Sequence, residues 1–98
     1  MQIAYKTKKL EKICTDYSFA VRTHGEKRAV LIYRRLYEIE AADSVEMMIK
    51  GQIGRCHPLK GKRNGQYAVD LDHPYRLIFD KQGDNIQIVR IIEIADYH

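Results

Sequence analysis

The spacing of the apolar residues changes once along the chain, near Gly51, and this change limits the fold more than any other feature. Before it, apolar side chains recur about every three to four residues, as they do in helices; after it, they alternate with polar ones, as they do in strands. Helices followed by strands predict an α+β fold of two layers, with two main N-terminal helices packed on a small, mostly antiparallel sheet. A chain of 98 residues can build one core, so we expect a single domain over residues 1–98.

The first quarter of the chain predicts a short strand and a helix. Residues 1–5 alternate weakly and could form the strand. Thr7 is a favourable N-cap for a helix that begins at Lys8. Residues 16–25 are either irregular or a continuation of this helix, and the sequence does not decide between the two.

A long helix over residues 26–41 is the clearest local prediction. Its expected buried face is Ala29, Ile32, Tyr33, Leu36 and Ile39, and its expected solvent face is Lys27, Arg28, Arg34, Arg35 and Glu38. Asp43, with Glu46 three residues later, resembles a capping box. It predicts a short helix that ends at Gly51.

Turn signals divide the second half into strands. Asn64-Gly65 favours a hairpin, and Pro74 stands in a turn where no strand N–H is needed. The expected antiparallel strands are residues 53–59, 66–72, 75–80 and 86–95. The last of these is apolar on both faces, so we expect it to lie inside the sheet.

A cluster of cations surrounds the first predicted hairpin. Basic groups beside glycines, which let a backbone approach closely, suit a phosphate chain. The candidate RNA-binding residues are Arg55, His57, Lys62 and Arg63, and Lys60 is a candidate catalytic residue. A solvated hairpin tip would explain the same lysines.

Arg76 is the candidate for binding a phosphate on the sheet itself. In its strand it alternates with Tyr75 and Leu77 and shares a face with Ile78. A guanidinium presents a planar fork of donors that stays charged. Asp70 and Asp80 are alternative, purely structural partners.

Tyr97 and His98 follow the last predicted strand directly and are candidates for proton transfer. Histidine gives and takes protons near neutral pH. In a regular strand His98 would share a face with Ile94, whereas Tyr97 would share the other with Ile91 and Ala95. Both can serve one phosphate only if the chain leaves strand geometry after about Ala95.

Together these groups suit RNA cleavage, in which the substrate's own 2′-OH is the nucleophile. Histidine or tyrosine can move the protons, and arginine and lysine can stabilise the charge on the phosphorane, without a metal or cofactor. Residues 1–63 hold 14 Lys and Arg against 7 Asp and Glu, whereas residues 64–98 hold 3 against 6. A basic half favours an anionic partner.

The sequence contains no apolar run long enough for a membrane span and no secretory signal. Cys14 and Cys56 are widely separated, have no metal-ligand spacing, and are expected to be reduced thiols. We therefore expect a cytoplasmic protein.

Three motifs in order make the chain resemble a known family. They are Arg-Cys-His-Pro-Leu-Lys-Gly at 55–61, His-Pro-Tyr-Arg-Leu-Ile-Phe at 73–79 and Asp-Tyr-His at 96–98. The chain resembles HigB-like toxins, also called plasmid maintenance system killer proteins, of the RelE/ParE type II toxin–antitoxin superfamily.

The resemblance implies a ribosome-dependent mRNA interferase that cuts mRNA in the A site of the 30S subunit and so inhibits translation. A helix-turn-helix, HigA-like antitoxin would neutralise it in a hetero-oligomer. Carried over by motif, Lys60 and Arg76 would stabilise charge, Tyr97 would stack or orient a base, and His98 would act as acid or base. Two alternatives are a ParE-like poison of DNA gyrase and a non-catalytic nucleic-acid-binding module.

Overall fold

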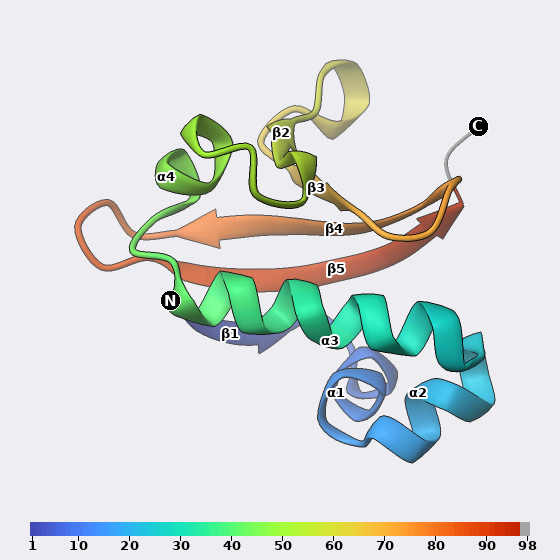
Figure 1. Ribbon diagram of the computed structural model, residues 1–98. Coiled ribbons are helices and arrows are strands. Elements are labelled where there is room, and N and C mark those ends of the chain that lie inside the picture. Colours follow the sequence, from blue (N-terminus) through green and yellow to red (C-terminus); the bar gives the residue numbers. More distant parts are fainter. Residues whose placement is uncertain (97–98) are drawn as a thin grey trace.

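The computed structural model describes residues 1–96 and confirms the expected α+β architecture (Figure 1). Its helices are α1 (Lys8–Thr15), α2 (Tyr17–His24), α3 (Glu26–Ala41) and α4 (Val45–Lys50), with short 3₁₀ turns η1 (Ile53–Arg55) and η2 (Gly61–Arg63). Its strands are β1 (Gln2–Tyr5), β2 (His57–Pro58), β3 (Tyr67–Asp70), β4 (Tyr75–Gln82) and β5 (Ile88–Asp96). Figure 1 shows α1, α2 and α3 gathered beside β1 and β5, with α4 nearer β2 and β3.

The strands form one five-stranded sheet in the order β1-β5-β4-β3-β2. All neighbours are antiparallel except β1 and β5, which run parallel from Gln2↔Ile88 to Tyr5↔Ile91. The last strand therefore lies inside the sheet, as its apolar sequence predicts. The parallel pair arises because the chain returns to β1 only after all the helices and three strands.

Side-chain caps explain where the first two helices begin. The Thr7 hydroxyl accepts from the Leu10 N–H at 3.1 Å, as predicted. Asp16 accepts from the Phe19 N–H at 3.2 Å and begins α2. The undecided segment is therefore a second helix, separated from the first by a capping aspartate.

The main core lies between the helices and one face of the sheet, which we call the first face. α3 buries Ala29, Ile32, Leu36 and Ile39 there, as predicted. The sheet contributes Val69, Leu77, Phe79, Val89 and Ile91, and Leu71 follows directly after β3. Tyr33 is only partly buried, and its hydroxyl donates to the Ile13 carbonyl at 2.9 Å.

The cap of α4 differs from the prediction by one residue. Ser44, rather than Asp43, accepts from the Met47 N–H at 3.1 Å. Glu46 forms an ion pair with Lys81 and accepts from the Gln87 amide at 2.7 Å. Glu46, which the sequence pattern assigned to a capping box, instead connects α4 to the β4–β5 hairpin through these two contacts.

These bonds make stability depend on pH. They hold the pKa of Glu46 at about 2, below its ordinary 4.5, chiefly through the hydrogen bond from Lys81. Because the unfolded state then binds the proton more tightly, the stabilisation is present above about pH 4.5 and is lost as pH falls toward 2. The carboxylate is largely exposed, so we expect a loss of only about 0.5–1 kcal/mol.

Urea unfolding of wild type and Glu46→Gln at pH 7, 4 and 2.5 measures this contribution. We expect Glu46→Gln to be less stable than wild type at pH 7, and the difference to shrink at pH 4 and to be smallest at pH 2.5. Glu40→Gln removes an exposed carboxylate from α3 and serves as the control. Equal pH dependence in Glu46→Gln and wild type would contradict the assignment.

The strand predicted at 53–59 is wrong over most of its length. Gln52, Gly54 and Arg55 have φ of 55°, 58° and 54°, in the left-handed region that strands do not use. Extended pairing is reduced to His57–Pro58. The predicted turn at Asn64-Gly65 exists, since the Gln66 N–H donates to the Arg63 carbonyl at 2.9 Å, but it lies within a longer connection that contains η2.

A bulge in β5 changes which residues share a face. Ile78 pairs with Glu93 and Phe79 pairs with Ile91, so Ile92 has no counterpart on β4. The extra residue reverses the alternation. Ala95 consequently lies on the opposite face from Ile91, and the predicted grouping of these two residues is wrong.

No helix among the described residues is long and apolar enough to cross a membrane.

Candidate functional site

The sheet carries a second, smaller buried cluster on the face away from the main core, which we call the second face. It consists of Leu59, Ala68, Ile78 and Ala95. The connection between β2 and β3, residues 59–66, closes when the Leu59 N–H donates to the Gln66 carbonyl at 2.8 Å. This connection, which we call the 59–66 loop, carries three of the predicted cations.

Arg76 lies on the second face, opposite Asp70 in the β3–β4 register. Its Nε is 3.4 Å from Asp70 Oδ1. Arg55 donates from Nε to Asp70 Oδ2 at 2.6 Å. Two predicted site residues that are distant in sequence therefore converge on a single carboxylate, which also raises the pKa of Arg55 above its ordinary value.

Arg35 supports this pair of arginines from the first face. Its Nε donates to the Asp70 carbonyl at 2.7 Å, and its Nη1 donates to Glu38 at 2.9 Å. Gly54 packs closely against it, because a Cβ at Gly54 would lie 2.8 Å from Arg35 Cδ. The sequence placed Arg35 on the solvent face of α3, and nothing in its local pattern indicates this role.

The 59–66 loop is fastened to β5 by Arg63. Its Nη2 donates to Glu93 Oε1 at 2.6 Å, and its Nη1 donates to Gln66 at 2.9 Å. Arg63, which the sequence predicted to contact RNA, therefore forms its hydrogen bonds with protein groups. Lys60 and Lys62 are exposed on the same loop.

His57 is placed by its pairing with Ala68 on β3. Its Nδ1 lies 2.8 Å from the Arg55 carbonyl. A carbonyl only accepts, so Nδ1 is the donating nitrogen in this hydrogen bond. The carbonyl of one predicted RNA-binding residue thus orients another.

The predicted catalytic residues Tyr97 and His98 lie outside the described residues. The strand that leads to them is described as far as Asp96, which pairs with Tyr75, the neighbour of Arg76.

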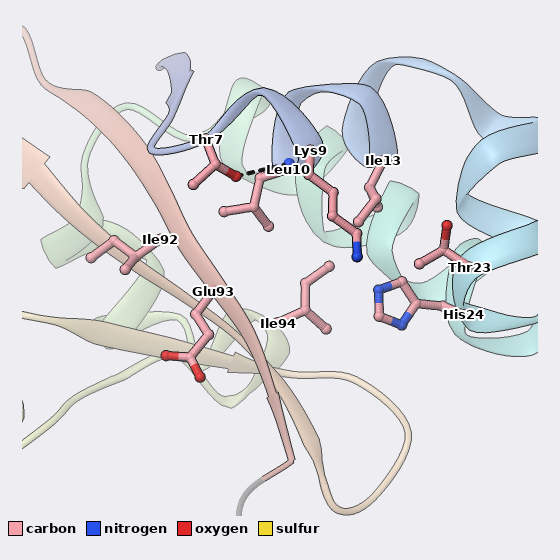
Figure 2. Close-up of a pocket in the computed structure, with 9 residues that line it drawn as sticks. All are labelled: Thr7, Lys9, Leu10, Ile13, Thr23, His24, Ile92, Glu93 and Ile94. Atoms are coloured by element: carbon pink, nitrogen blue, oxygen red, sulfur yellow. Dashed lines mark hydrogen bonds between the residues drawn. The ribbon is translucent and has the colours of Figure 1, made fainter.

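A separate cleft of about 330 Å³ lies between α1, α2 and β5 (Figure 2). Leu10, Ile13 and Ile94 give it an apolar floor, and Figure 2 shows the Lys9 side chain reaching toward the His24 ring. Burial, followed by the charges of Arg28 and Lys9, lowers the pKa of His24. The cleft opens on the helical side of β5, away from Arg76.

Within residues 1–96, no group of three or more His, Cys, Asp and Glu side chains is placed to hold a metal ion. Cys14 and Cys56 are free and buried, and burial raises their pKa values to about 12 and about 11. On the second face, the side chains of Arg55 and Arg76 meet at the carboxylate of Asp70.

The fold is similar to that of solved structures of YoeB and YoeB/ParE toxins. A YoeB–YefM complex from Staphylococcus aureus matches with a TM-score of 0.63 and 23% identity over 100% of this chain and 97% of that chain. The YoeB dimer from Staphylococcus aureus gives 0.63 and 22% over the same shares. A YoeB/ParE toxin from Agrobacterium tumefaciens gives 0.59 and 16% over 100% of both chains.

No family model and no curated protein matches the sequence.

Proposed function

We propose that the protein is the toxin of a type II toxin–antitoxin pair and acts as a metal-independent endoribonuclease. The observation that carries the proposal is the meeting of Arg55 and Arg76 at Asp70, beside the loop that presents Lys60. Cations on a sheet face suit the negative charge that develops on a phosphorane. The toxin fold of its structural neighbours supports the same proposal.

The finer assignment follows the sequence motifs. We place the protein in the HigB-like branch, as a cytoplasmic, ribosome-dependent mRNA interferase of the plasmid-maintenance type. Its mRNA substrate lies in the A site of the 30S subunit. Lys60 and Arg76 stabilise charge, His98 moves a proton, and Tyr97 orients a base, with His57, Lys62 and Arg55 as further RNA contacts.

Arg63 has a different proposed role from the one its sequence context suggests. Its bonds to Glu93 and Gln66 hold the 59–66 loop in place, so it would act on RNA indirectly by positioning Lys60.

The partner would be a HigA-like helix-turn-helix antitoxin, bound in a hetero-oligomer. Two structural neighbours are toxin–antitoxin complexes of YoeB with YefM, which supports an antitoxin partner for this chain as well. Co-expression with the product of the adjoining reading frame, followed by co-purification, tests the pairing.

The experiment that tests the activity adds the purified protein to translating ribosomes and maps mRNA 5′ ends. We expect new ends inside codons. Untreated protein and protein from which bound metal has been removed should produce them equally well. Intact mRNA at every protein concentration would refute the proposal.

A gyrase poison remains the second candidate, because one neighbour is described as a YoeB/ParE toxin. A supercoiling assay distinguishes the two. Inhibited supercoiling together with intact mRNA would favour gyrase, whereas salt-sensitive RNA binding without either effect would favour a binding module.

A further inference from the structure

Asp70 is an unusual residue at a proposed phosphate-binding site, because its carboxylate is negative and lies between arginine side chains. Its carboxylate faces Arg55 Nε at 2.6 Å and Arg76 Nε at 3.4 Å. Its main-chain carbonyl accepts from Arg35 at 2.7 Å. One residue therefore touches a cation of the η1 turn, a cation of β4 and a cation of α3.

The chain adopts an unfavourable backbone to bring Arg55 to this carboxylate. Arg55 has φ of 54°, in the left-handed region that non-glycine residues rarely occupy. Strained backbone persists where the surroundings hold it and tends to occur at functional sites. Here the surroundings are Asp70 and the contact between Gly54 and Arg35.

From this geometry we propose that Asp70 is a positioning residue, which holds Arg55 and Arg76 as a preformed clamp for one RNA phosphate. The assignment deepens the proposed nuclease function and rests on it. In a sheet, neighbouring arginines repel each other unless an anion lies between them. The carboxylate supplies that anion before RNA arrives and fixes both planar forks on the second face.

The carboxylate has two opposing effects on RNA. It orients the arginines, which favours the chemical step, and it repels the phosphate, which weakens binding. Removing its charge should therefore separate rate from affinity. A residue that only stabilised the fold would change the unfolding transition and leave both quantities unchanged in the folded protein.

The test is Asp70→Asn, with the single-turnover cleavage rate on programmed ribosomes measured against toxin concentration. We expect the saturating rate to fall about 10-fold or more, while the half-saturating concentration stays the same or falls. Asp70→Glu, which keeps the charge, should recover part of the rate. A thermal melt shows that each variant is folded.

Asp80→Asn is the matched control. Asp80 also accepts two hydrogen bonds from a guanidinium on the second face, from Arg90 at 3.2 and 2.7 Å. It lies on β4, four residues after Arg76. We expect this variant to cut at the wild-type rate. A wild-type saturating rate in Asp70→Asn, or an equal fall in Asp80→Asn, would overturn the assignment.

A failure of the proposed nuclease function can be distinguished from a failure of the role proposed for Asp70. Wild-type protein that leaves mRNA intact would refute the nuclease and the clamp together, whereas active wild type with an indifferent Asp70→Asn would refute the clamp alone.

Discussion

Arg76→Ala is expected to lower mRNA cleavage about 10²–10³-fold, the magnitude typical of removing one preorganised donor from a charge-stabilising site. The guanidinium is held on the second face by β4 and by Asp70, and its side chain is only 22% exposed. Its position is therefore set before substrate binds. Arg76→Lys keeps the charge but loses the planar fork, so we expect an intermediate rate.

The fold should tolerate this loss. Asp70 keeps its bonds from Arg55 after truncation, so this carboxylate retains a cation. We expect the free energy of unfolding to change by about 1 kcal/mol or less. Urea unfolding and cleavage of a defined mRNA by the same preparation measure the two effects.

Arg90→Ala is the control for Arg76→Ala. Arg90 is also paired to a carboxylate on the second face, through Asp80, and lies toward the opposite end of the sheet. It should cut mRNA at the wild-type rate. Comparable losses in the two arginine variants would mean that cleavage depends on the general charge of this face, and near-wild-type cleavage by Arg76→Ala would remove it from the site.

The sequence predicted the elements whose pattern is local. The buried face of α3 and the alternation in β4 follow from one repeating period each, and the structure confirms both. Alternation in β4 placed Arg76 beside Ile78 on one face. The sequence also offered Asp70 and Asp80 as structural partners for Arg76, and the structure pairs Arg76 with Asp70.

Contacts between segments that are distant along the chain could not be predicted from local sequence patterns. The left-handed turn that ends in Arg55 packs against Arg35, 20 residues earlier, and no local period reports such a contact. The bulge at Ile92 is likewise invisible, because an apolar run looks the same with or without one extra residue. A single such residue was enough to move Ala95 to the second face.

Phe79→Ala should produce the largest loss of stability, about 3–5 kcal/mol. Phe79 is fully buried on the first face, where its ring stacks on Tyr67 with centroids 5.6 Å apart. The alanine would leave a cavity between the sheet and the helices, because strands that pair on both sides cannot move to fill it. Phe79→Leu should lose much less, since it retains most of the volume.

Tyr37→Ala is the matched control for Phe79→Ala, because it removes an aromatic ring that is 74% exposed on α3. It should change the free energy of unfolding by about 0.5 kcal/mol or less. Urea unfolding of the three variants measures the difference. Equal stability of Phe79→Ala and Tyr37→Ala would mean that Phe79 lies outside the core. The alternation that puts Phe79 on the first face and Arg76 on the second would then be wrong as well, so the same measurement tests the placement of the candidate site.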